Sequence, residues 1–255
     1  MKRTIITGIL ALAAGTTGLL AQQQQQQLVP HTKSPGESQA VIALIQSQNN
    51  PDATIKAAED LISKYADTYY KETALIFEAD AYRQKGDFDK AQIYGERVLQ
   101  VNPKNYQITN MLGTLIVQQT RDNDLDKEQK LAKADGYFNA TITNVSAATK
   151  PNPQLTDEQW EGARKALIAD AHNGLGMDAM ARKKYDVAIA EFKQAVDGAP
   201  DEPAYQVRLA SAYQNAGQNA EAIALCDKVL ANPQIPEAIR QVATGVKTAA
   251  SAPKK

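Results

Sequence analysis

The chain has 255 residues, of which 43% are hydrophobic, and its formal net charge at pH 7 is -1. A nearly neutral chain lacks the basic surface that nucleic-acid binding requires, so we expect no nucleic-acid partner. Its single cysteine, Cys226, cannot form an internal disulfide, and zinc sites built from cysteine pairs are excluded, so packing alone must hold the fold together.

The first 21 residues have the layout of a secretory signal. Lys2 and Arg3 form a short cationic start, residues 4–20 carry no charge, and Ala21 precedes a polar tract. We expect cleavage after Ala21 and export to the periplasm or cell envelope. An uncleaved membrane anchor is the alternative, because the uncharged run borders the lower limit for a spanning helix. Glycines and threonines within the run favour the cleaved peptide.

Residues 22–35 are polar, open with six glutamines and offer little to bury, so we interpret them as a flexible tether. In the rest of the chain, Ala, Gln, Lys, Glu and Leu recur at helical spacing, whereas β-branched alternation never persists. The remainder is therefore predicted to be all-α.

Helical runs of about 12 to 16 residues are separated by regularly spaced breaks, which calls for a search for repeats. Segment 169–202 aligns with segment 203–236 so that small and apolar residues coincide, with Gly176 over Ala210 and Ala188 over Ala222. The same period places matching residues in segment 72–105, namely Ala79, Tyr82, Gly86, Phe88, Ala91, Val98, Leu99 and Pro103.

This pattern resembles the tetratricopeptide repeat (TPR) family, whose 34-residue unit is a pair of antiparallel helices. The resemblance implies a right-handed superhelical solenoid of about five units. Small residues at offsets 8 and 20 of a unit let its two helices approach closely, and larger residues at offsets 11, 17 and 24 fill the surrounding space. We expect two blocks of units, residues 36–145 and 156–250, joined by a proline-containing linker at 146–155.

Several irregularities are expected within this array. The first unit is degenerate, with helices at 36–48 and 52–65, and the third carries an insertion at 120–128. A capping box from Thr156 to Gln159 predicts a long helix from about Asp157 to Ala181. A further amphipathic helix at 237–248 should cover the last unit, and residues 251–255 should be loose.

No pattern for catalysis or cofactor binding is present, and we expect neither an enzyme nor a small-molecule substrate. His31 lies in the tether, and His172 occupies a packing position of a repeat. The acidic residues of the insertion are Asp122, Asp124, Asp126 and Glu128. A calcium loop would need glycine and glutamate where Lys127 and Lys133 stand, so we expect a solvated loop without metal. Cys226 is expected to be a small core residue.

What remains is binding of proteins or peptides. In the TPR family the first helix of each unit lines a concave groove through offsets 2, 5, 9, 12 and 13. Carried over, the resemblance implies a groove lined by Ile76, Asp80, Arg83, Gln84, Asn110, Thr114, Val117, Gln118, Asn173, Met177, Met180, Val207, Ser211, Gln214 and Asn215. The lysines with which one TPR subclass holds C-terminal carboxylates are missing from these positions. We expect a neutral, partly apolar groove, with Met177 and Met180 pointing into solvent.

These observations predict an exported, non-catalytic scaffold for partner proteins. One alternative is a cell-envelope or outer-membrane assembly factor, although such repeat proteins usually carry a cysteine at the cleavage site. The other is a metal-dependent regulator or enzyme that uses the acidic insertion.

Overall fold

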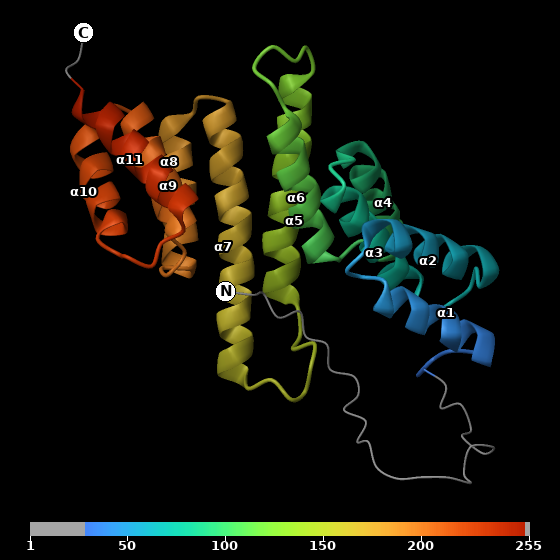
Figure 1. Cartoon of the computed structure of the whole chain (residues 1–255). Helices are drawn as coiled ribbons and strands as arrows, with labels where there is room; N and C mark the ends of the chain where they lie inside the picture. The colour runs from blue at the N-terminus through green and yellow to red at the C-terminus, as the bar shows by residue number, and fades with distance from the viewer. Residues whose placement is uncertain (1–28, 253–255) are drawn as a thin grey trace.

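The computed structural model describes residues 29–252, which form eleven α-helices and no strand (Figure 1). The first six helices are α1 (Pro35–Gln46), α2 (Pro51–Lys64), α3 (Lys71–Gln84), α4 (Phe88–Val101), α5 (Tyr106–Gln119) and α6 (Lys127–Ala147). The remaining five are α7 (Asp157–Ala181), α8 (Tyr185–Gly198), α9 (Pro203–Asn215), α10 (Asn219–Leu230) and α11 (Glu237–Ser251). None of the helices in residues 29–252 is long and apolar enough to cross a membrane. The predicted signal lies outside the described residues.

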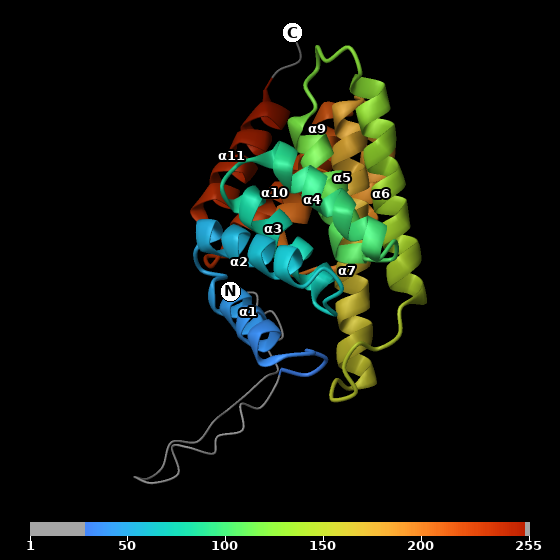
Figure 2. The same ribbon diagram turned by 90° about the vertical axis from the view of Figure 1, so that its right-hand side faces the viewer.

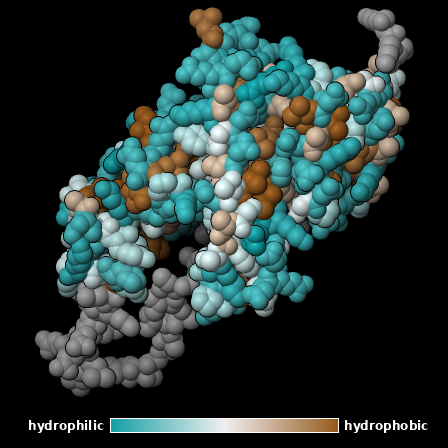
Figure 3. Space-filling model, turned by 180° about the vertical axis from the view of Figure 1, so that it is seen from behind, coloured by the Kyte–Doolittle hydropathy of each residue, from teal (hydrophilic) through white to brown (hydrophobic). Residues whose placement is uncertain are grey.

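The helices form a row of hairpins, so the all-α solenoid prediction is confirmed. Each of α3, α5, α7 and α9 packs against the helix that follows it, and neighbouring hairpins pack against each other. Figure 1 shows the row running from α1 and α2 at one end to α9, α10 and α11 at the other, and Figure 2 views it from the end formed by α1 and α2. Seen from behind, the surface is mostly hydrophilic, with apolar side chains in scattered patches (Figure 3).

The helix ends follow from local residue chemistry. Gly86 and Gly217 follow α3 and α9 with φ of 74° and 77°, a left-handed conformation that costs glycine little. In both places the next N–H reaches back to the helix, from Asp87 to the Tyr82 carbonyl and from Gln218 to the Tyr213 carbonyl. These bonds satisfy carbonyl groups that a helix end would otherwise leave unpaired.

The predicted capping box at the start of α7 is confirmed. The Gln159 N–H donates to Thr156 Oγ1 at 3.1 Å, and the Thr156 N–H donates to Gln159 Oε1 at 2.9 Å. The helix then runs for 25 residues to Ala181, as predicted from the capping box. It begins about three turns before the repeat unit and lies alongside α6, which has 21 residues (Figure 1).

The two long helices are held to their neighbours by an aromatic ring. Phe138 of α6 is completely buried, and its ring faces Gly113 of α5 and Gly174 of α7. A Cβ atom would lie 2.8 Å from that ring at Gly113 and 2.2 Å at Gly174. Phe192 of α8 is placed in the same way against Gly176. The contacts of Gly113 with Phe138 and of Gly176 with Phe192 join offsets 8 and 24 of one unit, as the repeat pattern predicts. The contact of Gly174 with Phe138 joins two units.

Several boundaries differ from the sequence predictions, including that of α11, which runs to Ser251 instead of ending at 248. Residues 29–34 are docked on the first hairpin instead of belonging to the tether, because Tyr70 donates to the Pro30 carbonyl at 2.8 Å and His31 stacks on Tyr69. The loop of the insertion is shorter, at 120–126, since α6 already begins at Lys127. Helix α1 ends at Gln46, two residues earlier than expected, where Ser47 closes its last turn.

Candidate partner-binding groove

A hollow of about 630 Å³ lies between α3 and α5. Six of its lining residues are predicted groove positions: Ile76, Asp80 and Arg83 from α3, and Asn110, Thr114 and Gln118 from α5. The same hollow is lined by residues that the repeat pattern did not single out, namely Phe88, Gln107, Ile108, Met111 and Leu115. The structure therefore brings these predicted residues of the second and third units together on one surface.

The polar groups of this hollow are unequally satisfied. The Arg83 Nε–H donates to Asp80 Oδ1 at 2.9 Å, which neutralises this pair within α3. Asn110 differs, because its Oδ1 atom is buried and has no hydrogen-bond partner among the described residues. A buried acceptor without a donor is costly, so this atom is a weak point in the packing of the groove wall.

A second hollow, of about 330 Å³, adjoins the first at Gln118, which lines both. Its predicted members are Val117, Gln118, Met177, Met180 and Ser211, contributed by α5, α7 and α9. Ala181, Phe192 and Arg208 complete the lining. The two hollows together form one groove across α3, α5, α7 and α9, which we call the concave groove.

Methionine is concentrated in the concave groove. Met111 lines the first hollow, and Met177 and Met180 line the second. These are all the methionines that the described residues contain. The expectation that Met177 and Met180 point freely into solvent is wrong, because both are half-buried and pack against the cluster that contains Phe192 and Leu209. They form a wall of the groove and also contribute to the core.

Two predicted groove residues are buried, and only one of them reaches the groove. Val207 is 3% exposed and packs with Val229 and Ala243, because α11 lies over α9 and covers it. Val117 is 8% exposed and reaches the groove only with its edge. Gln214 lines neither hollow, whereas Asn173 lies at the border of the second, where it accepts a hydrogen bond from Arg208 at 2.8 Å.

Sequence reasoning missed Arg208 and Met111. Both occupy offset 6 of their units, one residue beyond a position assigned to the groove. They can line the groove because the face of a helix includes more than one residue per turn. Counting the neighbours of each groove offset would have found them. Phe88 and Phe192 come from the second helices of their units, and no groove rule points to them.

The acidic insertion forms a loop at the top of Figure 1 that is closed by ion pairs. Lys127 Nζ lies 2.8 Å from Asp122, and Lys130 Nζ lies 2.9 Å from both Asp124 and Asp126. The lysines hold the pKa values of Asp122 and Asp124 below their usual range. No group of three potential metal ligands occurs within residues 29–252.

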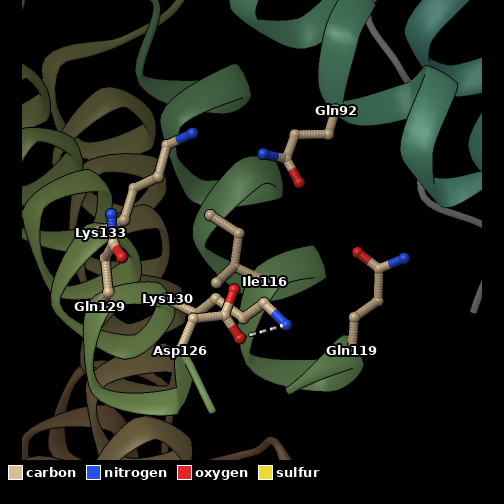
Figure 4. A pocket seen from close by; sticks show the side chains of 7 residues that line it. All are labelled: Gln92, Ile116, Gln119, Asp126, Gln129, Lys130 and Lys133. Atoms are coloured by element: carbon tan, nitrogen blue, oxygen red, sulfur yellow. Dashed lines mark ion pairs between the residues drawn. The ribbon is translucent and has the colours of Figure 1, made fainter. Parts of the chain in front are cut away.

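A third hollow, of about 440 Å³, lies beside this loop (Figure 4). Its walls are flexible amide and lysine side chains from α4, α5 and α6, and the Asp126–Lys130 ion pair crosses its edge. Ile116 contributes its apolar floor. The charged side chains at this hollow are already held in ion pairs, so the hollow belongs to the solvent-exposed surface around the loop.

The remaining titratable groups of interest serve packing. His172 Nδ1 lies 2.7 Å from Glu191, which ties α7 to α8. Cys226 is completely buried, as expected for a core residue, and burial raises the pKa of its thiol. Glu78 is 1% exposed in α3, and burial raises its pKa to about 7. None of these groups lines the concave groove.

Comparisons with known proteins agree with this geometry. Two tetratricopeptide repeat profiles match the sequence, one over residues 173–238 and the other over residues 73–105. The sequence matches none of the curated proteins with which it was compared.

Several solved structures share the fold. A TPR protein of Thermus thermophilus is 19% identical, with a TM-score of 0.57 over 82% of this chain and 98% of that one. PilW, a type IV pilus biogenesis factor, is 17% identical, with a TM-score of 0.58 over 85% and 90%. The assembly chaperone of RpL4, Acl4, is 14% identical, with a TM-score of 0.62 over 84% of each chain. Residues 73–105 and 173–238 are thus tetratricopeptide repeats, and the chain folds as an all-α solenoid of such repeats.

Proposed function

We propose that the protein is an exported, non-catalytic scaffold that holds a segment of a partner protein in the concave groove. The observation that carries this proposal is the meeting of the two hollows at Gln118, which makes one continuous surface across four helices. Packed helices lie about 8 to 10 Å apart, so a path across four helices is at least roughly 30 Å long. That length accommodates about nine residues of extended chain.

The chemistry of the groove suits such a segment. Its apolar side chains, including Ile76, Met111, Met177 and Met180, offer adaptable contacts for the partner's side chains. Amide and hydroxyl side chains lie between them, namely those of Asn110, Thr114 and Gln118. Partly apolar surface with separated polar groups is typical of grooves that bind protein segments.

Export is part of the proposal and rests on the uncharged run that ends at Ala21. An exported scaffold without catalytic groups would act by positioning its partners in the envelope. The partner proteins are therefore expected among envelope proteins of the same cell.

Site-specific photocrosslinking tests the groove. Benzoylphenylalanine would replace Gln118, which is exposed where the two hollows meet, and in a matched control Ile93, which is 54% exposed on α4 outside the groove. We expect protein adducts from envelope extract with the reagent at position 118 and none at position 93. Adducts of equal yield at both positions, or none at 118, would contradict the proposal.

A further inference from the structure

Arg208 of α9 differs from the other arginines that the structure describes. Arg83, Arg164, Arg182 and Arg240 each pair with a carboxylate. Arg97 lies over the ring of Tyr94, and Arg121 is exposed to water. Arg208 is half-buried, and no carboxylate within residues 29–252 lies within 4.0 Å of it. It is thus a partly desolvated cation without a counter-ion.

The position of this cation is set by its neighbours. One guanidinium nitrogen, Nη1, donates to Asn173 Oδ1 at 2.8 Å, which holds the side chain against α7. Asp170, one turn earlier on α7, is engaged by the hydroxyl of Tyr205 instead. The other nitrogens of Arg208 make no hydrogen bond within the described residues, and Arg208 lines the second hollow with Met177 and Met180. A cation is therefore available at the edge of an apolar hollow.

We propose that the second hollow binds an apolar side chain of the partner segment and that Arg208 pairs with an acidic side chain next to it. This inference rests on the proposed function, because it names the chemistry that the same groove selects. Partly buried charges in proteins are normally paired, and a guanidinium matches a carboxylate through two parallel hydrogen bonds. The apolar side chain occupies the hollow itself, and the carboxylate lies at its edge beside Arg208.

Methionine methyl NMR provides a direct test, because the described residues contain only three methionines and two of them line the hollow. Three probes would be titrated into protein carrying ¹³C-methyl methionine: acetyl-Leu-Glu-methylamide, its Leu-Gln counterpart, and acetyl-leucine with a free chain end. We expect the Leu-Glu probe to shift the Met177 and Met180 signals, and to bind about tenfold more tightly than the Leu-Gln probe. The Met111 signal of the first hollow should move less.

Variants assign the effect to the arginine. In R208Q, the Leu-Glu and Leu-Gln probes should bind equally, and in R208K, which keeps the charge but loses the paired geometry, the preference should be intermediate. R240Q, on α11 outside the groove, should leave the preference unchanged. The circular dichroism of each variant would establish that the repeats remain folded.

Four results would overturn the inference. They are equal binding of the Leu-Glu and Leu-Gln probes to the unmodified protein, a preference that survives in R208Q, tighter binding of acetyl-leucine than of Leu-Glu, and no shift with any probe. Each leaves the crosslinking test at position 118 intact, because that test needs no acidic partner. Loss of the crosslink, in contrast, would remove the groove function itself.

Discussion

Replacement of Gly174 by alanine tests the central packing interaction of the solenoid. Gly174 lies within α7, and a Cβ atom there would come 2.2 Å from Cε1 of Phe138. Ordinary contacts with a Cβ atom are longer than 3.4 Å, so the ring would have to move by about 1 Å. The Phe138 side chain is completely buried and also touches Gly113, which leaves it little room to move.

The magnitude follows from two opposing effects. Overpacking of a core costs about 1 to 3 kcal/mol, whereas alanine in place of a helical glycine stabilises a helix by about 1 kcal/mol. Gly162 offers a matched control, since it lies in the same helix and a Cβ atom there would meet nothing within 4 Å. We expect Gly162→Ala to stabilise the protein and Gly174→Ala to destabilise it.

Urea unfolding followed by circular dichroism would measure both variants. A second substitution, Phe138→Leu, should reduce the cost of Gly174→Ala, because the two residues share one contact. Equal stability of Gly162→Ala and Gly174→Ala would refute the close contact between Phe138 and Gly174. So would a cost of Gly174→Ala that the Phe138→Leu background leaves unchanged.

Three further predictions concern other parts of the chain. Burial raises the pKa of Glu78 in the folded state from 4.5 to about 7, so the folded protein loses stability as the pH rises between these values. In urea unfolding, the free energy of unfolding of Glu78→Gln should therefore rise relative to wild type by up to about 3 kcal/mol between pH 4 and pH 8, and a pH-independent difference would contradict this. Ala188→Leu should lower the free energy of unfolding by about 1 to 3 kcal/mol, because this side chain is completely buried, and an unchanged melting temperature would count against the repeat register. Mass spectrometry of envelope-purified protein should find Gln22 at the N-terminus, and retention of Met1 would favour the uncleaved anchor.

The repeat pattern predicted the fold well because it records contacts within each hairpin. Gly176 and Phe192 are spaced as the repeat requires, and the structure places them in contact. Contacts between hairpins were harder to predict. Gly174 touches Phe138 of the preceding unit, whose distance in sequence is altered by the insertion. That contact depends on how two units stack, which the pattern inside one unit does not contain.

The groove shows the same difference between what one repeat unit determines and what depends on its neighbours. Ile76, Asn110 and Thr114 line one hollow as predicted, because helical periodicity alone decides which face they occupy. Val207 has the same periodicity but is covered by α11, and the placement of that helix depends on the end of the array. Arg208 could be identified as unpaired only once its neighbours across α7 were known.

The junction between α5, α6 and α7 connects stability with the groove. Phe138 fixes α5 against α7 from inside. Arg182, at the end of α7, pairs with Asp178 of the same helix and ties α7 to α6 through Glu128 at 3.0 Å and Asp135 at 2.9 Å. The Arg182 side chain is only 9% exposed and that of Asp178 only 2%, so loss of the arginine's charge would leave the buried Asp178 carboxylate without a partner. Since α5 lines both hollows, this junction also sets how the two halves of the groove lie relative to each other. Substitutions at the junction would alter binding and folding together, whereas Gln118 and Arg208, which lie at the surface of the groove, can report on binding alone.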